Sequence, residues 1–221
     1  MGLWIEVVLF YVVYVLVHSF FSSSEEMVLL GRERFGLARE KGAGLLGAEM
    51  KLVNRFGGLI PYVLVYSQVL EAGSSLAVCG VVVEVIVYIV VKDSVIAYLK
   101  SLKVFFPARS KLPLNPSGHT FMFVNGVFVL FPVCYEGLRR GRVSGVLALV
   151  IVGEYNRLLS ETIRHYHTFH DVALGVVVFC VFRALVYPVR RAYGSYSYTN
   201  EWGIPEYVLV AAAVGVAIVA A

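Results

Sequence analysis

The sequence predicts an all-α integral membrane protein, a polytopic bundle of six or seven transmembrane helices with an interfacial amphipathic segment. Of the 221 residues, 59% are hydrophobic and only 15% are charged, and the mean hydropathy is +0.77. A soluble domain could not bury that much apolar surface. Apolar runs of roughly 20 residues, the length that crosses about 30 Å of hydrocarbon, recur along the chain. We therefore expect a single multi-pass membrane domain over residues 1–221, with the cell membrane as its location.

Seven apolar runs are the predicted spans, and they cover residues 2–21, 57–70, 75–98, 119–136, 143–160, 170–189 and 204–221. The second run is short and broken by Pro61, and the last is a Val/Ala run, so six spans are nearly as well supported as seven. The first run lacks the basic start and small-residue cleavage site of a signal peptide, so we expect it to be retained as a span.

A polar stretch of residues 22–56 separates the first two runs and mixes apolar clusters with arginine and lysine. Ser22 or Ser23 stands three residues before Glu25 or Glu26, the spacing of a capping box. The stretch therefore predicts one or two amphipathic helices in the membrane interface, with a solvated loop as the alternative. The net charge of +4 is modest and dispersed, which favours anionic lipid headgroups over nucleic acid as partners.

Charged residues inside the apolar runs are costly in hydrocarbon unless they are paired. We expect Glu84 and Glu6 to meet basic residues of other helices. Glu154 and Arg157, three residues apart, can pair with each other or reach the site from below. Three cysteines also fall inside apolar runs, without the CxxC spacing of a zinc site or a disulfide framework, and are expected in the core: Cys79, Cys134 and Cys180.

The first chemical motif is Pro116-Ser117-Gly118-His119, at the start of the fourth predicted span. A helix N-terminus leaves several backbone N–H groups unpaired and carries the positive end of the helix dipole, so it suits a phosphate. Proline and serine before a helix are also ordinary capping residues. The preceding segment adds five basic residues, Lys92, Lys100, Lys103, Arg109 and Lys111.

The second motif is His167-x-x-x-Asp171, between the fifth and sixth predicted spans. If the sixth helix starts near His167, Asp171 lies one turn further on the same face. The carboxylate can then hold one imidazole nitrogen and leave the other as a nucleophile or general base. The alternative is a group of histidines that only reach toward the lipid headgroups.

Taken together, the two motifs resemble the type 2 phosphatidic acid phosphatase superfamily of membrane lipid phosphatases, over roughly residues 75–190. The family pattern combines Lys-x6-Arg-Pro, Pro-Ser-Gly-His and Ser-Arg-x5-His-x3-Asp. The second part is complete here, and the third keeps Ser160 in register with the histidine and aspartate. The first part fits only loosely around Lys103, and Glu161 stands where the family has arginine, with Arg157 and Arg164 as the nearest substitutes.

The resemblance implies a role for each matching residue, without metal or cofactor. His167 would attack phosphorus to form a phosphohistidine, Asp171 would orient it, and His119 would protonate the departing lipid oxygen. Phosphate-binding groups would neutralise the charge on the phosphoryl oxygens, and the predicted set is Lys103, Arg109, Lys111, Ser117, Gly118 and Arg164.

The predicted function is hydrolysis of a lipid phosphate or diphosphate, of the polyprenyl or glycerolipid kind. One alternative is a lipid phosphotransferase resembling sphingomyelin synthase, which shares Ser-Gly-His-Thr and His-x-x-x-Asp. A second is a metal-binding or transport protein in which His165, His167 and His170 are ligands, and a third is a non-catalytic lipid-binding protein. The expected partners are a lipid phosphate and membrane lipids, with no nucleic acid; the sequence leaves open whether the chain forms a homo-oligomer.

Overall fold

The computed structural model describes residues 3–40, 56–105, 112–193 and 204–220. Within these ranges the regular secondary structure is helical, with one isolated β-bridge between Phe105 and Pro113. This confirms the predicted all-α class.

Four helical segments of the described chain are long and apolar enough to cross a membrane. The first, Ser75–Ser101, is one continuous stretch made of α5 (Ser75–Val90), the π-helical η2 (Val91–Val95) and α6 (Ile96–Ser101). The other three are α7 (Gly118–Arg139), α8 (Val143–Tyr166) and α9 (Phe169–Tyr193). These four segments match four of the predicted spans.

The remaining predicted spans are shorter or bent. After η1 (Gly57–Leu59), α4 covers only Ile60–Glu71, because Pro61 starts the helix and Gly73, at φ +69°, follows its end. The last helix, α10 (Ile204–Ala220), has 17 residues. A fifth span results if α1 (Leu3–Ser22) is counted with α2 (Glu25–Glu40), across a bend of 88°. Among the described residues the structure thus shows four or five candidate spans, and the predicted six or seven are not confirmed.

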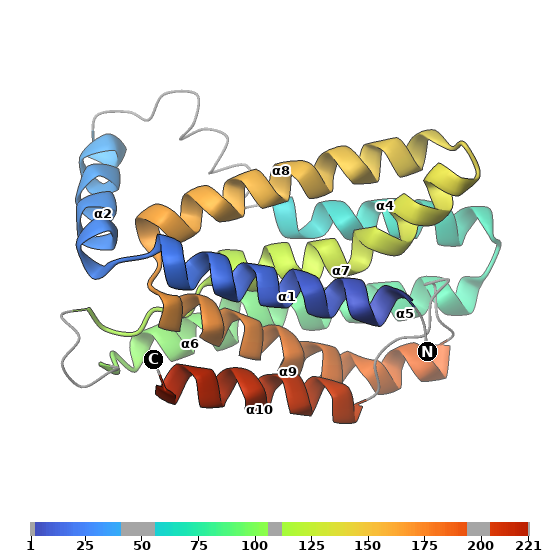
Figure 1. The fold of residues 1–221 in the computed structure, drawn as a ribbon. Helices are drawn as coiled ribbons and strands as arrows, with labels where there is room; N and C mark the ends of the chain where they lie inside the picture. Colours follow the sequence, from blue (N-terminus) through green and yellow to red (C-terminus); the bar gives the residue numbers. More distant parts are fainter. Residues whose placement is uncertain (1–2, 41–55, 106–111, 194–203, 221) are drawn as a thin grey trace.

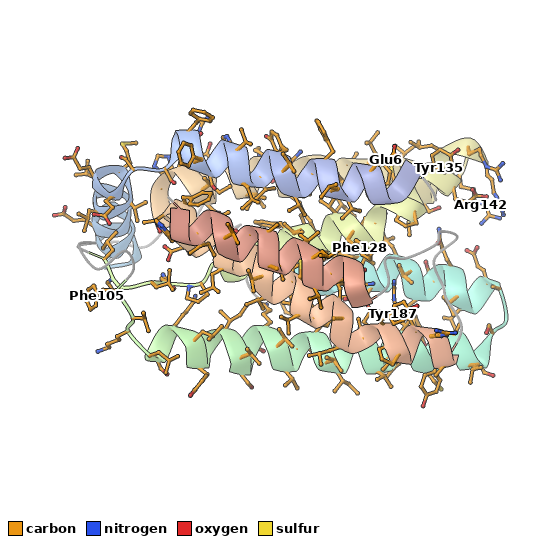
Figure 2. All side chains as sticks on the ribbon, turned by 60° about the horizontal axis from the view of Figure 1, so that its bottom comes forward. Glu6, Phe105, Phe128, Tyr135, Arg142 and Tyr187 are labelled. Atoms are coloured by element: carbon orange, nitrogen blue, oxygen red, sulfur yellow. The ribbon has the colours of Figure 1, made fainter. Side chains whose placement is uncertain are left out.

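The long helices lie side by side and α2 stands across one end of the bundle (Figure 1). The same end holds the last turn of α8 and the first turn of α9 (Figure 1). Figure 2 shows Phe105 at this end and Arg142 at the opposite end. The bend of 88° between α1 and α2 is the geometry expected of an interfacial helix. The rest of the predicted interfacial stretch, residues 41–55, lies outside the described residues.

Helix α7 occupies the centre of the bundle and packs against α4, α8 and α9. Its close approach to α8 depends on glycine, since a Cβ on Gly137 would lie 2.5 Å from the Cα of Gly145. A Cβ on Gly175 of α9 would likewise lie 2.7 Å from the carbonyl oxygen of Ser117, just before α7. Glycine at these positions brings the two ends of α7 into direct contact with its neighbours.

A buried ion cluster links four of the helices. Arg183 and Arg190 of α9 donate to the two carboxylate oxygens of Glu84 on α5, at 2.6 and 2.8 Å. Tyr62 of α4 donates to the same carboxylate at 3.1 Å, and Asn125 of α7 donates to the Tyr62 hydroxyl at 3.0 Å. The Glu84 side chain is 0% exposed, so the predicted pairing of this residue with other helices is confirmed. The three cysteines divide differently from the prediction, since Cys134 and Cys180 are buried but Cys79 is exposed.

Candidate active site

The two histidines of the sequence motifs meet at the end of the bundle where α2 lies. His119 is the second residue of α7, and His167 lies between α8 and α9. Their ring centroids are 6.2 Å apart, with an angle of 57° between the ring planes. Two imidazoles that are 48 positions apart in the sequence are therefore within reach of a single phosphoryl group.

Asp171 lies beside His167, the second histidine of this pair. Its Oδ2 lies 3.6 Å from Nδ1 of His167, an electrostatic contact rather than a close hydrogen bond. The carboxylate accepts the backbone N–H of Asn115 at 2.5 Å and that of Thr168 at 3.1 Å. Thr168 Oγ1 in turn accepts the N–H of Asp171, which forms a capping box at the start of α9. These bonds fix the carboxylate beside the imidazole, and its side chain is 1% exposed.

His167 itself precedes the helix that carries Asp171. It ends α8 in an extended conformation, φ −132° and ψ 135°, and α9 begins only at Phe169. The predicted contact between the two residues is present, but it arises from the bend between two helices and not from one helical face. A carboxylate beside Nδ1 favours a proton there and leaves the lone pair on Nε2.

Ser117 caps α7 and does not offer its own N–H to a ligand. Its Oγ accepts the backbone N–H of Thr120 at 3.0 Å, and its backbone N–H donates to the carbonyl of Asp171 at 2.9 Å. Gly118 follows as the first residue of α7, half-buried, where a helix has no internal acceptor for its N–H. Of the two predicted backbone donors, Gly118 fits the role and Ser117 is instead structural.

The predicted basic residues are distributed differently from the expectation. Lys103 is exposed and lies in the turn after α6 with φ 48°, whereas Arg109 and Lys111 lie outside the described residues. Arg164 is exposed in the last turn of α8, where its charge acts on His18 of α1. No contact of the described residues places Lys103 or Arg164 at the histidine pair.

Two other lysines act on the site. Besides burial and the neighbouring His167, the charges of Lys100 and Lys92 act on His119, and both lysines belong to the helical stretch Ser75–Ser101. In a regular α-helix, residues eight apart differ by about 80° in direction. The π-turn Val91–Val95 takes up one extra residue, which reduces the difference to about 20°. The bulge therefore aligns the two ammonium groups on one face, and a sequence pattern read with a regular helical period misses it.

The charged residues of α8 near the third motif lie on its exposed surface. Glu161, at the position where the family has arginine, has its carboxylate 3.5 Å from Nε2 of His165, and these side chains are 50% and 40% exposed. Arg157 pairs with Glu154 at 2.5 Å, as predicted. Glu161 does not join the contacts of the histidine pair among the described residues.

The alternative of a histidine metal centre lacks a suitable geometry. The described part of the chain contains no group of three or more His, Cys, Asp or Glu residues placed to hold a metal ion. His165 turns to Glu161, and His170 packs edge-on against Phe169 at 5.6 Å between ring centroids.

No protein-family model, curated protein or solved structure matches the chain.

Proposed function

We propose that the protein is a membrane enzyme that hydrolyses a lipid phosphate through a phosphohistidine intermediate. The observation that carries the proposal is the 6.2 Å approach of His119 and His167, with the Asp171 carboxylate behind His167. This arrangement supplies a nucleophile with its orienting acid on one side and a proton donor on the other.

In the proposed reaction, Nε2 of His167 attacks phosphorus and the bond from phosphorus to the lipid oxygen breaks. The departing oxygen takes a proton from His119, and the negative charge of the bound phosphate must hold that proton on the imidazole against the nearby ammonium groups of Lys92 and Lys100. Water then attacks the phosphohistidine, the bond from phosphorus to nitrogen breaks, and His119 takes the proton of the water. Asp171 stabilises the positive imidazole during both steps.

Charge neutralisation is assigned to Lys92, Lys100 and the N-terminus of α7. The ammonium groups and the Gly118 N–H would offset the negative charge on the phosphoryl oxygens as the bond breaks. This differs from the assignment that the sequence suggested, which rested on Lys103 and on two residues outside the described chain.

The membrane placement of the site is part of the proposal. Helix α2 lies across the bundle at the same end, and three of its large apolar side chains are 40–53% exposed: Met27, Leu29 and Leu30. Its Val28 is 0% exposed, and Gly31 packs on the backbone carbonyl of His165. We propose that α2 lies at the headgroup level, so that lipid phosphates reach the histidines from the bilayer surface. The cell membrane as the particular location stays a prediction.

The deciding experiment is phosphate release by the purified full-length protein from lipid phosphates in vesicles, in the presence of EDTA. We expect release without metal and without an acceptor alcohol. Release only when an acceptor alcohol is added would instead indicate a phosphotransferase. Loss of activity in EDTA, restored by a divalent cation, would contradict the phosphohistidine mechanism.

Asp171→Asn is expected to fold and to lower kcat by about 10²–10⁴-fold, because the amide no longer stabilises the positive imidazole. Steady-state phosphate release and the thermal unfolding midpoint, measured on the same preparation, separate a chemical effect from a folding defect. Wild-type kcat in this variant would remove Asp171 from the mechanism.

Lys100→Gln is expected to lower kcat/KM by about 100-fold, because it removes one cation that acts on the phosphoryl group. Lys103→Gln is the matched control, since Lys103 is an exposed lysine three residues further on, in the turn after α6, and we expect less than about a twofold change there. Kinetics on one lipid phosphate at several salt concentrations measure both variants. A larger loss for Lys103→Gln than for Lys100→Gln would indicate that the phosphate is bound by Lys103, in the turn after α6, and not by Lys100.

A further inference from the structure

The start of α7 rests directly on the first turns of α9. The segment Ser117–Thr120, which we call the α7 turn, contains His119. The segment Asp171–Gly175, which we call the α9 turn, begins four residues after the second histidine of the site. The backbone N–H of Ser117 donates to the carbonyl of Asp171 at 2.9 Å. The two histidines therefore flank a direct backbone contact between two helices.

Gly175 lies at the closest point of this contact. A Cβ at this position would lie 2.7 Å from the carbonyl oxygen of Ser117, and 2.9 and 3.3 Å from Cβ and Cγ2 of Thr120. Gly175 is buried, and Ser117 and Thr120 are both 0% exposed. Non-bonded carbon atoms pack at about 3.5–4.0 Å, so an added methyl group would require the two turns to separate by roughly 0.5–1 Å. No side-chain rotation provides this room, because a backbone carbonyl and a Cβ are the nearest atoms.

The proposed chemistry is sensitive to a separation of this size. The two imidazoles must reach opposite sides of one phosphoryl group, and their ring centroids are 6.2 Å apart. A misplacement of about 1 Å in a catalytic site can lower the rate about 100-fold. Because His119 belongs to the α7 turn and His167 precedes the α9 turn, a wider contact withdraws the proton donor from the nucleophile.

We infer that Gly175 is a positioning residue that sets the distance between the proton donor His119 and the nucleophile His167. The inference rests on the proposed function. Gly175 acts through the contact between the two turns, since its missing side chain is what lets them meet. Glycine weakens a helix relative to alanine, so alanine here would favour the helical state of α9. A loss of activity in Gly175→Ala would therefore not come from helix propensity.

The test compares two substrates of Gly175→Ala in the full-length protein, in the same detergent micelles. One is an alkyl lipid phosphate, whose leaving oxygen needs a proton. The other is a nitrophenyl phosphate that bears the same alkyl chain, whose leaving group departs without one. We expect kcat for the alkyl phosphate to fall about 30–100-fold, and the loss for the aryl phosphate to be about tenfold smaller or less. Gly153→Ala on α8 is the matched control, because a Cβ there would have no atom within 4 Å, and both of its rates should stay close to wild type.

Equal losses on the two substrates would overturn the inference, because they would assign Gly175 to the stability of the bundle or to phosphate binding. Wild-type rates on both substrates would overturn it as well. A wild-type protein that releases phosphate from neither substrate would overturn the proposed function, and this inference with it. An active wild type confines any failure to Gly175.

Thermal unfolding midpoints in detergent show which variants are folded. If Gly175→Ala does not fold, the double variant Gly175→Ala/Thr120→Ala decides. It removes the Thr120 γ groups and gives the added methyl room on one side, while the contact with the Ser117 carbonyl remains. We expect the double variant to fold and to lose more activity on the alkyl than on the aryl phosphate, and Thr120→Ala alone to show no such difference. A double variant that is unfolded, or that loses both rates equally, would overturn the inference.

Discussion

Replacing His167 with alanine is expected to abolish phosphoenzyme formation and to lower kcat by about 10⁴-fold or more, because no other group of the proposed mechanism forms the covalent bond. The residue is 5% exposed and is bounded by His119 on one side and Asp171 on the other. A base-stable phosphoprotein trapped with labelled substrate, together with steady-state phosphate release, measures both effects.

His165→Ala is the matched control for this prediction. His165 lies two residues earlier, pairs with Glu161 and is 40% exposed, so its loss should leave both the phosphoenzyme and kcat close to wild type. Near-native activity of His167→Ala would refute the mechanism. Loss of activity in both variants would point to a structural role of the whole α8–α9 connection.

Replacing Glu84 with glutamine is expected to produce the largest loss of stability, about 3–5 kcal/mol in the free energy of unfolding. The single carboxylate serves both Arg183 and Arg190, whose side chains are 1% and 4% exposed. A neutral amide leaves these guanidinium groups buried without a counter-charge. Denaturant unfolding in mixed detergent micelles, followed by helical circular dichroism, measures the difference.

Glu6→Gln controls for the loss of a membrane carboxylate in general. Glu6 is exposed near the start of α1, so we expect a change within about 0.5 kcal/mol. If Glu84→Gln were as stable as the wild type, the cluster would not hold α5 and α9 together. If Glu6→Gln were equally destabilising, the loss of stability in Glu84→Gln would reflect a change of the unfolded state in detergent and not the loss of the ion cluster.

Hydropathy and motif spacing were sufficient to predict the helical class, the four long spans and the pairing of Glu154 with Arg157. They left the number of spans open: the second run is short and interrupted by Pro61, and the structure confines α4 to twelve residues between Pro61 and Gly73. They also could not identify the partners of Glu84, which lie about 100 positions away at Arg183 and Arg190. Such contacts depend on how helices are arranged, and a single sequence does not record that.

The candidate site was predicted only in part, again because a single sequence does not record how the helices are arranged. The pairing of His119 with His167 followed from two motifs, and the structure brings the two rings together. The basic residues were chosen from the resemblance to the family's first motif, which fits only loosely and favoured Lys103. The lysines whose charges act on His119 are instead Lys92 and Lys100. Both belong to the helical stretch Ser75–Ser101, which is further from Pro116 in the sequence.

The π-turn at Val91–Val95 makes the length of a helix a determinant of the proposed chemistry. Removing one residue within the π-turn would leave an ordinary helix in which Lys92 and Lys100 are seven positions apart and still differ by about 20° in direction. Removing one apolar residue between the π-turn and Lys100 would instead rotate Lys100 by about 100° relative to Lys92. Lys100 would then point to the lipid although every ionisable group of the chain is retained. A deletion in the regular part of this helix would therefore disrupt the proposed phosphate site, whereas a deletion of the extra residue of the π-turn would preserve it.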